Sequence, residues 1–110
     1  MDTRTADFYW QSIPIGQKNA ATYEMLMSLW GIKDRREVRR ILQMLSDEYE
    51  AFDGYALVRS GRFHGFFRTN DKKILEPFYR EIERKAHSLD VQKRKVQNVL
   101  NRSEGQLTLF

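Results

Sequence analysis

Four polar side chains recur on one side of residues 34–46 and could bind an anionic partner. If this stretch is a helix, three arginines and one glutamine share a face at i, i+3, i+4 and i+7: Arg36, Arg39, Arg40 and Gln43. An arginine binds phosphate or a guanine edge through two parallel hydrogen bonds, and a glutamine binds an adenine edge in the same way. The pattern is therefore typical of a DNA-contacting helix. A basic helix face that is only solvated fits the same residues.

The opposite face of this segment is apolar. It is formed by Val38, Ile41, Leu42 and Leu45. Asp34 is placed to cap the helix, and Glu37, three residues later, to complete a capping box. We predict that the helix buries its apolar face and exposes its arginines. Lys33 and Arg35, beside its start, complete the candidate DNA-binding residues of this segment.

A second helix is predicted immediately before it. Thr22 is an N-cap candidate, Gly31 a left-handed C-cap, and Ile32 the apolar residue that often follows such a cap. The expected apolar face comprises Tyr23, Met25, Leu26, Leu29 and Trp30. Helix, glycine-containing turn and basic amphipathic helix are the order of a helix-turn-helix; an ordinary helical hairpin in a small bundle is the alternative.

A β-hairpin is predicted next. Residues 55–59 and 62–67 are rich in β-forming side chains, and Ser60–Gly61 between them is typical of a two-residue turn. A hairpin after a recognition helix makes a winged helix, whose tip residues, here Arg59 and Arg62, would contact the DNA backbone or minor groove. Alternatively, these charges only prevent the hairpin from pairing with another strand.

A long helix is expected over residues 71–102. Asn70 or Asp71 can cap it, and Pro77 predicts either a kink or a restart with proline in the first turn. An apolar seam recurs every seven residues: Leu75, Ile82, Leu89 and Val96. At 1.5 Å per residue this helix is too long for so small a body to cover, so the seam predicts a homodimer. A solvent-exposed, partly frayed helix is the alternative.

Composition narrows the function classes. The 110 residues suit one domain with an appendage, and the net charge of +4 favours an anionic partner such as double-stranded DNA. No cysteine is present, which fits a reducing cytoplasm and excludes thiolate metal sites, and no apolar run has the length of a membrane span. His64 and His87 lie on different elements, and no phosphate-binding or nucleophile motif occurs. We therefore expect no catalytic residues, metal or cofactor.

Residues 13–20 begin a resemblance to a known family. Ile-Pro-Ile-Gly-Gln-Lys-Asn-Ala is similar to the I-P-T-G-x-x-N-A lead-in of small winged-helix proteins encoded by phages and prophages of Gram-positive bacteria, with Ile15 in place of threonine. The segment 31–39 resembles the turn and the D-x-R-x-[VL]-R recognition helix of that family. The likeness covers residues 13 to about 100. It implies DNA binding in phage replication or regulation.

The last five residues carry a second resemblance. Gln-Leu-Thr-Leu-Phe is similar to the Q-L-x-L-F peptide by which polymerases and repair factors dock on the bacterial sliding clamp. The resemblance implies a hydrogen-bonding subsite for the glutamine and an apolar pocket for the other side chains, so the clamp-binding residues would be Gln106, Leu107, Leu109 and Phe110. Alternatively, this tail folds back as a strand against the hairpin.

These observations together predict an α+β, mostly α fold: a winged helix-turn-helix with a two-stranded wing, followed by a long C-terminal helix. Residues 1–70 would be the winged-helix domain with an aromatic N-terminal helix or arm, 71–102 the long helix, and 103–110 a flexible tail. The function we predict is DNA binding combined with engagement of the host sliding clamp, in or on DNA replication. The alternatives are a transcriptional regulator with a packed tail, and a protein-binding inhibitor that does not use DNA.

Overall fold

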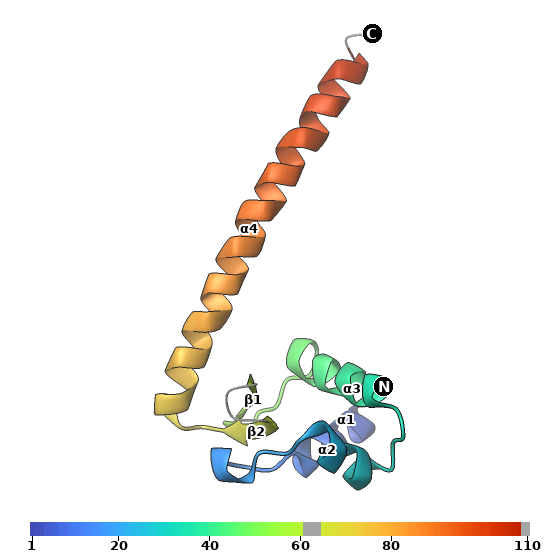
Figure 1. Ribbon diagram of the computed structural model, residues 1–110, viewed down its shortest axis with the longest axis vertical. Helices are drawn as coiled ribbons and strands as arrows, with labels where there is room; N and C mark the ends of the chain where they lie inside the picture. Colours follow the sequence, from blue (N-terminus) through green and yellow to red (C-terminus); the bar gives the residue numbers. More distant parts are fainter. Residues whose placement is uncertain (61–64, 109–110) are drawn as a thin grey trace. The chain divides into compact units, whose positions relative to one another are not determined.

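Four α-helices, one short 3₁₀-helix and a two-stranded antiparallel sheet make up the described part of the chain (Figure 1). The computed structural model describes residues 1–60 and 65–108, without the side chains of residues 60 and 103–108. The chain divides into two units, Met1–Leu75 and Glu76–Phe110. The predicted α+β, mostly helical class is confirmed.

The aromatic N-terminal segment forms a helix, α1 (Thr3–Ser12). Asp2 caps it by accepting a hydrogen bond from the Thr5 backbone N–H at 2.8 Å, and this bond lowers the pKa of the Asp2 carboxyl. Ala6 and Trp10 are buried on one side of the helix, one turn apart. Of the two conformations that the sequence allowed, the helix is therefore the one adopted.

Helix α2 (Tyr23–Trp30) begins and ends at the predicted signals. The Thr22 hydroxyl accepts a hydrogen bond from the Met25 N–H, and Gly31 adopts φ 65° and ψ 31°, a left-handed conformation that suits glycine. The Ile32 N–H donates to the Met27 carbonyl, five residues earlier, at 2.9 Å, which is the 6→1 hydrogen bond of a Schellman cap.

The inward face of α2 differs from the expected one. Met25 and Leu29 are exposed, by 54% and 57%, although we predicted them on the apolar face. The side chains that pack on the core follow i, i+3, i+4 and i+7 from the first helical residue: Tyr23, Leu26, Met27 and Trp30. In a helix of eight residues, the expected and the observed sets of inward side chains both agree with helical periodicity. Packing against the rest of the first unit decides which set is buried.

Helix α3 (Arg35–Asp47) carries the predicted amphipathic pattern. Its buried residues are Val38, Ile41, Leu42 and Leu45, as expected. Asp34 caps the helix by accepting from the Arg36 N–H at 2.9 Å. The predicted capping box is wrong in its second half: the Glu37 carboxylate lies 3.5 Å from Arg40 Nη2, one turn further along, and does not reach back to Asp34.

The hairpin exists, but its turn is not the predicted one. Strands β1 (Ala56–Ser60) and β2 (Gly65–Thr69) pair with Ser60 opposite Gly65, so residues 61–64 connect them and Ser60–Gly61 is not a two-residue turn. Contacts outside the hairpin explain this register. A Cβ at position 65 would lie 2.6 Å from the Ala21 carbonyl oxygen, so the register brings a glycine to this close approach.

The edge of β2 that does not pair with β1 is hydrogen-bonded to the segment between α1 and α2. Phe66 and Ala21 exchange two backbone hydrogen bonds of 2.8 and 2.9 Å, and the Arg68 N–H donates to the Pro14 carbonyl at 2.8 Å. The Gly16 N–H in turn donates to the Arg68 carbonyl at 2.9 Å, with Gly16 at φ 93°. Strand β2 is thus hydrogen-bonded on both edges, which fixes its register more firmly than a terminal turn does.

Arg68 is buried, with 5% of its surface exposed, and ties three segments together. Its Nε donates to the Ile13 carbonyl at 2.9 Å, Nη2 to the Gln11 carbonyl at 3.2 Å, and Nη1 lies 3.4 Å from Asp53 Oδ2. The guanidinium carbon also lies 5.8 Å from the centre of the Trp10 ring. A buried cation is tolerated here because each of its three nitrogen atoms has a polar partner.

Two side-chain hydrogen bonds join α1 to the segment after α3. The Trp10 indole N–H donates to Asp53 Oδ2 at 2.7 Å, and the Tyr49 phenol donates to the Asp7 carboxylate. The bond to Asp7 is the main reason that the pKa of Tyr49 is raised to about 12, because ionisation of the phenol would break it.

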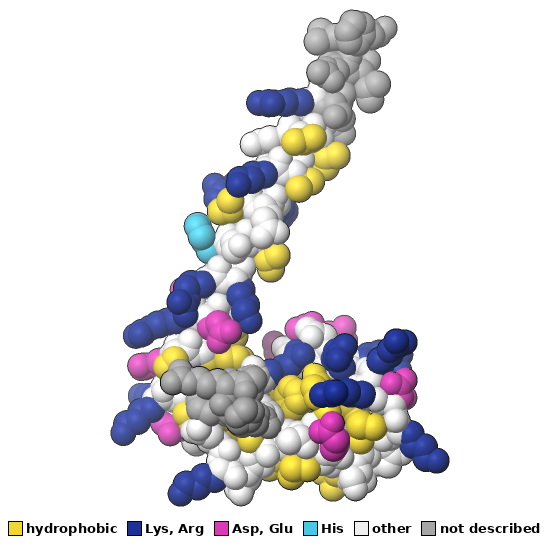
Figure 2. Space-filling model, viewed as in Figure 1, with side chains coloured by type: hydrophobic (Ala, Val, Ile, Leu, Met, Phe, Trp, Pro, Cys, Tyr) yellow, Lys and Arg dark blue, Asp and Glu magenta, His cyan; other side chains and the backbone are white. Residues whose placement is uncertain are grey.

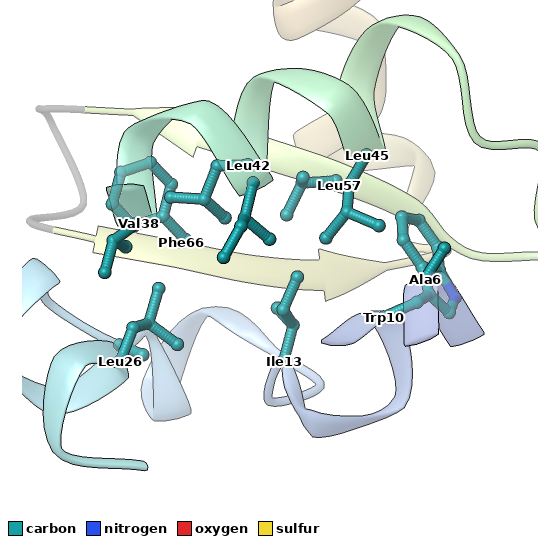
Figure 3. Close-up of a cluster of buried hydrophobic side chains, with 11 residues drawn as sticks. Ala6, Trp10, Ile13, Leu26, Val38, Leu42, Leu45, Leu57 and Phe66 are labelled. Atoms are coloured by element: carbon teal, nitrogen blue, oxygen red, sulfur yellow. The ribbon is translucent and has the colours of Figure 1, made fainter. Parts of the chain in front are cut away.

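A single apolar cluster lies between the helices and the sheet face (Figure 3). Side chains of α3 meet those of α1, of the following loop and of α2 over the inward face of the hairpin, and the buried members are Ala6, Trp10, Ile13, Ala21, Leu26, Val38, Ile41, Leu42, Leu45, Leu57 and Phe66. Val58 and Phe67, on the other face of the hairpin, are also buried, so both faces of the sheet are covered.

Helix α4 (Lys72–Thr108) is longer than predicted. Asp71 caps it by accepting from the Lys73 N–H at 3.0 Å, and Pro77 lies inside the helix and not in the first turn of a new one. The predicted end at Arg102, followed by a non-helical spacer, is wrong for the backbone of residues 103–108. Serine and glutamate are tolerated in helices, and a glycine costs only about 1 kcal/mol relative to alanine. Across the described residues, no helix combines the length and apolar character that crossing a membrane requires.

The Asp53 carboxylate should make the stability of the first unit depend on pH. Its pKa lies below the ordinary value, mainly because it accepts the Trp10 N–H, so the folded state binds fewer protons than the unfolded state near this pKa. The stabilisation is present above the unfolded pKa and is lost as the pH falls through the folded value. We expect Asp53→Asn to be less stable than wild type at pH 7, with a difference that shrinks below about pH 4.

Urea unfolding followed by tryptophan fluorescence measures this difference, because both tryptophans lie in the first unit. Glu50→Gln, which removes an exposed carboxylate of the segment between α3 and β1, serves as the control and should show no comparable pH dependence. A constant stability difference between Asp53→Asn and wild type from pH 7 to pH 3 would contradict the assignment.

Candidate nucleic-acid interface

The solvent side of α3 is lined by arginines. Arg36, Arg39 and Arg40 are exposed, whereas the opposite side of the helix is fully packed. These arginines and Gln43 border one surface depression with Met44, Asp47 and Glu48. Figure 2 shows the Lys and Arg side chains over this helix with acidic side chains among them. Because the buried face fixes how α3 is rotated, the arginines have no inward alternative.

Arg35 and Arg39 are positioned by an aromatic ring of the preceding helix. The guanidinium carbons lie 4.5 and 5.9 Å from the centre of the Tyr23 ring. Tyr23 in turn packs edge-on against Phe66 of β2, with ring centres 4.9 Å apart. A cation over an aromatic face is stabilised by about 0.5–1 kcal/mol at an exposed site, so the two guanidinium groups are partly oriented before any ligand binds.

Gln43 connects α3 to the hairpin. Its amide oxygen accepts a hydrogen bond from Arg59 Nη1 at 2.8 Å, and its amide nitrogen donates to Asp47 Oδ2 at 2.6 Å. Both polar ends of the side chain are therefore occupied. The predicted role of Gln43 in reading an adenine edge would require both bonds to break, and in the described conformation Gln43 instead orients Arg59.

Acidic side chains moderate the charge of this face. Glu37 is paired with Arg40 at 3.5 Å, with both side chains at least half exposed, and Asp47 and Glu48 lie at the C-terminal end of the depression. An exposed pair of this kind contributes at most about 1 kcal/mol, so a phosphate can replace Glu37 as the partner of Arg40. Among the described contacts, no acidic side chain pairs with Arg36 or Arg39, on the N-terminal half of α3.

The other candidate residues are placed as follows. Lys33 is exposed in the turn between α2 and α3, and Arg59 is half-buried on β1. Arg62 lies outside the described residues. In the predicted clamp-binding tail, Gln106 and Leu107 belong to the helical backbone of α4 but their side chains are not described, and Leu109 and Phe110 lie outside the described residues.

Sequence reasoning missed two positions that organise this surface. Tyr23 was taken only as an apolar helix residue, and no sequence signal indicates that two arginines lie over it. Asp47 could have been found, because glutamine and aspartate four residues apart on a helix commonly form a hydrogen bond.

Comparisons of the chain with protein-family models, curated protein sequences and solved structures gave no match. The described residues contain no group of three His, Cys, Asp or Glu side chains placed to hold a metal ion.

The Gln43–Arg59 bond should be measurable as an energetic coupling. We expect Gln43→Ala and Arg59→Ala to be non-additive in the free energy of unfolding, with a coupling of about 0.5–1.5 kcal/mol, because each single change already removes the bond. A double-mutant cycle by urea unfolding gives this value. Arg40→Ala combined with Arg59→Ala, which share no bond, should be additive, and additivity in both cycles would show that Gln43 does not hold Arg59.

Proposed function

We propose that the chain is a winged-helix DNA-binding protein of the phage type and that α3 is its recognition helix. The order α1, α2, turn, α3, β1 and β2 is the order of a winged helix-turn-helix. The observation that carries the proposal is the exposed arginine face of α3 opposite a fully buried one. Such a helix can enter the major groove without loss of core packing, because none of its DNA-facing residues is needed in the core.

The chemistry of the individual arginines suggests different contacts. Arg36 and Arg39 have no carboxylate partner among the described contacts, which favours them for base or phosphate contacts. Arg35, held over Tyr23 beside the start of α3, is suited to a phosphate at the edge of the groove. Arg59, held by Gln43, would contact the backbone beside the groove; Arg62, which lies outside the described residues, stays the second predicted wing contact.

Removal of the arginine face should abolish most of the DNA affinity. We expect the triple variant Arg36→Ala, Arg39→Ala, Arg40→Ala to fold normally and to lower the slope of log affinity against log salt by up to about 3 for mixed duplex DNA. Fluorescence anisotropy over a series of salt concentrations measures both the affinity and the slope.

A matched control removes the same charge elsewhere. Arg80→Ala, Arg84→Ala, Lys95→Ala also takes three positive charges from exposed positions of a helix, in the second unit. It should bind DNA nearly as well as wild type. If both triple variants lose affinity equally, the binding reflects net charge and not α3, and if neither does, the recognition-helix assignment is wrong.

The second part of the proposal concerns the tail. We propose that residues 106–110 dock on the bacterial sliding clamp, which would bring a DNA-bound protein to the replication machinery or allow it to interfere with that machinery. The support is the match of these five residues to the Q-L-x-L-F peptide. Three large apolar side chains close together are otherwise costly to expose on a protein surface.

Docking requires the last turn of α4 to unwind. Gln106, Leu107 and Thr108 have helical backbone, whereas a linear motif binds with its side chains spread along a groove. Helix ends fray readily, and Gly105 weakens the turn just before the motif by about 1 kcal/mol relative to alanine. The unwinding cost is thus small compared with the binding energy of the apolar anchors, and micromolar affinity is expected for one tail.

Clamp binding should depend on the apolar anchors more than on the glutamine. Leu109→Ala or Phe110→Ala should weaken binding to purified sliding clamp by more than tenfold, and Gln106→Ala by less, because buried apolar anchors dominate small interfaces. Isothermal titration calorimetry measures the affinities, and Thr108→Ala, at the variable position of the motif, is the control. DNA affinity should be unchanged in all four variants. Undetectable clamp binding, together with a loss of stability in Phe110→Ala, would favour the regulator with a packed tail.

A further inference from the structure

Helix α4 carries an apolar face that its own unit does not cover. From residue 79 onwards, this face contains the seam predicted from the sequence and the positions between its members. Together they follow the a and d positions of a heptad repeat, and from here on the seam means all of them: Tyr79, Ile82, Ala86, Leu89, Lys93, Val96 and Leu100. The exposed fractions are 48% at Ile82 and 64% at Leu89. So many large apolar side chains along one line of a helix are costly to leave in water, at about 25 cal/mol per Å².

We propose that the seam binds the same seam of a second copy of this chain, as a parallel, in-register, two-stranded coiled coil. This inference does not depend on the proposed DNA or clamp binding. Three observations favour this arrangement: the residues that border a depression on the seam fit a second heptad helix, the charges beside the seam set its orientation, and the one polar residue within the seam limits the number of chains.

A depression on the seam has the composition of two consecutive coiled-coil holes. It is lined by Leu89, Gln92, Lys93, Val96, Gln97 and Leu100. In a parallel, in-register pair, the first four of these residues surround the knob supplied by position 93 of the partner, and the last four surround the knob supplied by position 96. The surface therefore has gaps of the kind into which a second heptad helix inserts its side chains.

The flanking charges select the parallel orientation. On one side of the seam lie the e residues Glu83 and Asp90, and on the other side the g residue Lys85. In a parallel pair, a g residue faces the e residue five positions later in the partner, so Lys85 of each chain would face Asp90 of the other. In an antiparallel pair, e residues face e residues, so Asp90 of one chain would face Asp90, Glu83 or the uncharged Gln97 of the other, and the pair between Lys85 and Asp90 could not form.

These side chains are free to exchange partners. Within one helix, Lys85 Nζ lies 3.2 Å from Glu81, and Arg94 Nε lies 3.6 Å from Asp90, with all four side chains more than half exposed. Exposed pairs of this kind contribute little, so pairing between chains can replace them at low cost.

Lys93 limits the assembly to two chains. A lysine at an a position of a dimer can place its stem along the seam and its ammonium group in water, which is harder in the more enclosed core of a trimer or tetramer. The same residue weakens the seam. We therefore expect a dimer that dissociates on dilution.

Cysteine cross-linking distinguishes the orientations, because the chain contains no cysteine. In a parallel, in-register dimer, Ile82→Cys and Val96→Cys should each form a disulfide with the same position of the partner under mild oxidation. Asn98→Cys, on the outer side of α4, is the control and should not. If neither position cross-links to itself although the unmodified protein sediments as a dimer, the helices are antiparallel or out of register and the proposal is wrong.

Charge exchange provides an independent test. Lys85→Glu and Asp90→Lys should each weaken the homodimer by about tenfold, because two attractive pairs become repulsive. Mixed in equal amounts, the two variants should form heterodimers in which both pairs are attractive again. Sedimentation equilibrium with one labelled variant measures this. Failure of the mixture to restore dimers would overturn the parallel register.

Disruption of the seam should separate the chains without unfolding the first unit. We expect Leu89→Asp to give monomers, since a carboxylate would be forced into the apolar contact, while Ser88→Asp, the neighbouring outer position, remains dimeric. The fluorescence of Trp10 and Trp30 reports whether the first unit is folded. Wild-type protein that is monomeric at tens of micromolar, with the first unit folded, would overturn the proposal.

Discussion

The buried guanidinium of Arg68 is the interaction on which the first unit depends. It sits on β2, between α1 and the loop before β1, and its donors reach two backbone carbonyls and the Asp53 carboxylate. If this cation were unpaired, its burial would cost several kcal/mol, so the three segments must assemble together. The position of β2 then sets the position of Tyr23 through Phe66, and with it that of Arg35 and Arg39. A structural arginine thus determines where the candidate DNA-binding arginines lie.

The parts of the fold predicted from the sequence are those encoded by local chemistry. Thr22, Gly31, Asp34 and Asp71 each satisfy backbone groups within a few residues, so their capping roles do not depend on the rest of the chain. The amphipathic pattern of α3 is equally self-contained, because four buried positions repeat over thirteen residues and leave one possible inward face. The arginine side of α3 could be predicted for the same reason.

The parts that were predicted incorrectly depend on distant contacts. The hairpin register follows from the close approach of Gly65 to Ala21, more than forty residues earlier, which no turn preference can reveal. The inward face of α2 is ambiguous in a helix of eight residues, and packing against the other elements decides it. The hydrogen bond between Gln43 and Arg59 was not foreseen, because it joins two elements that are sixteen residues apart; whether Gln43 also contacts DNA stays a prediction. The end of α4 was misplaced because a single glycine does not stop a helix.

The candidate DNA face, the seam and the tail share no residue, so any coupling among them has to arise from assembly. The proposed parallel dimer would hold two copies of α3 and would bring both tails to the same end of the paired helices. Such a dimer would bind DNA with two sites within its reach more tightly than a monomer does. By linkage, that DNA would strengthen dimerisation by the same factor. A clamp ring with repeated pockets would act in the same way on the two tails if their separation fits. In the proposed dimer, the weakening of the seam by Lys93 would therefore matter: a dimer that dissociates on dilution can respond to its ligands, whereas a permanent one cannot.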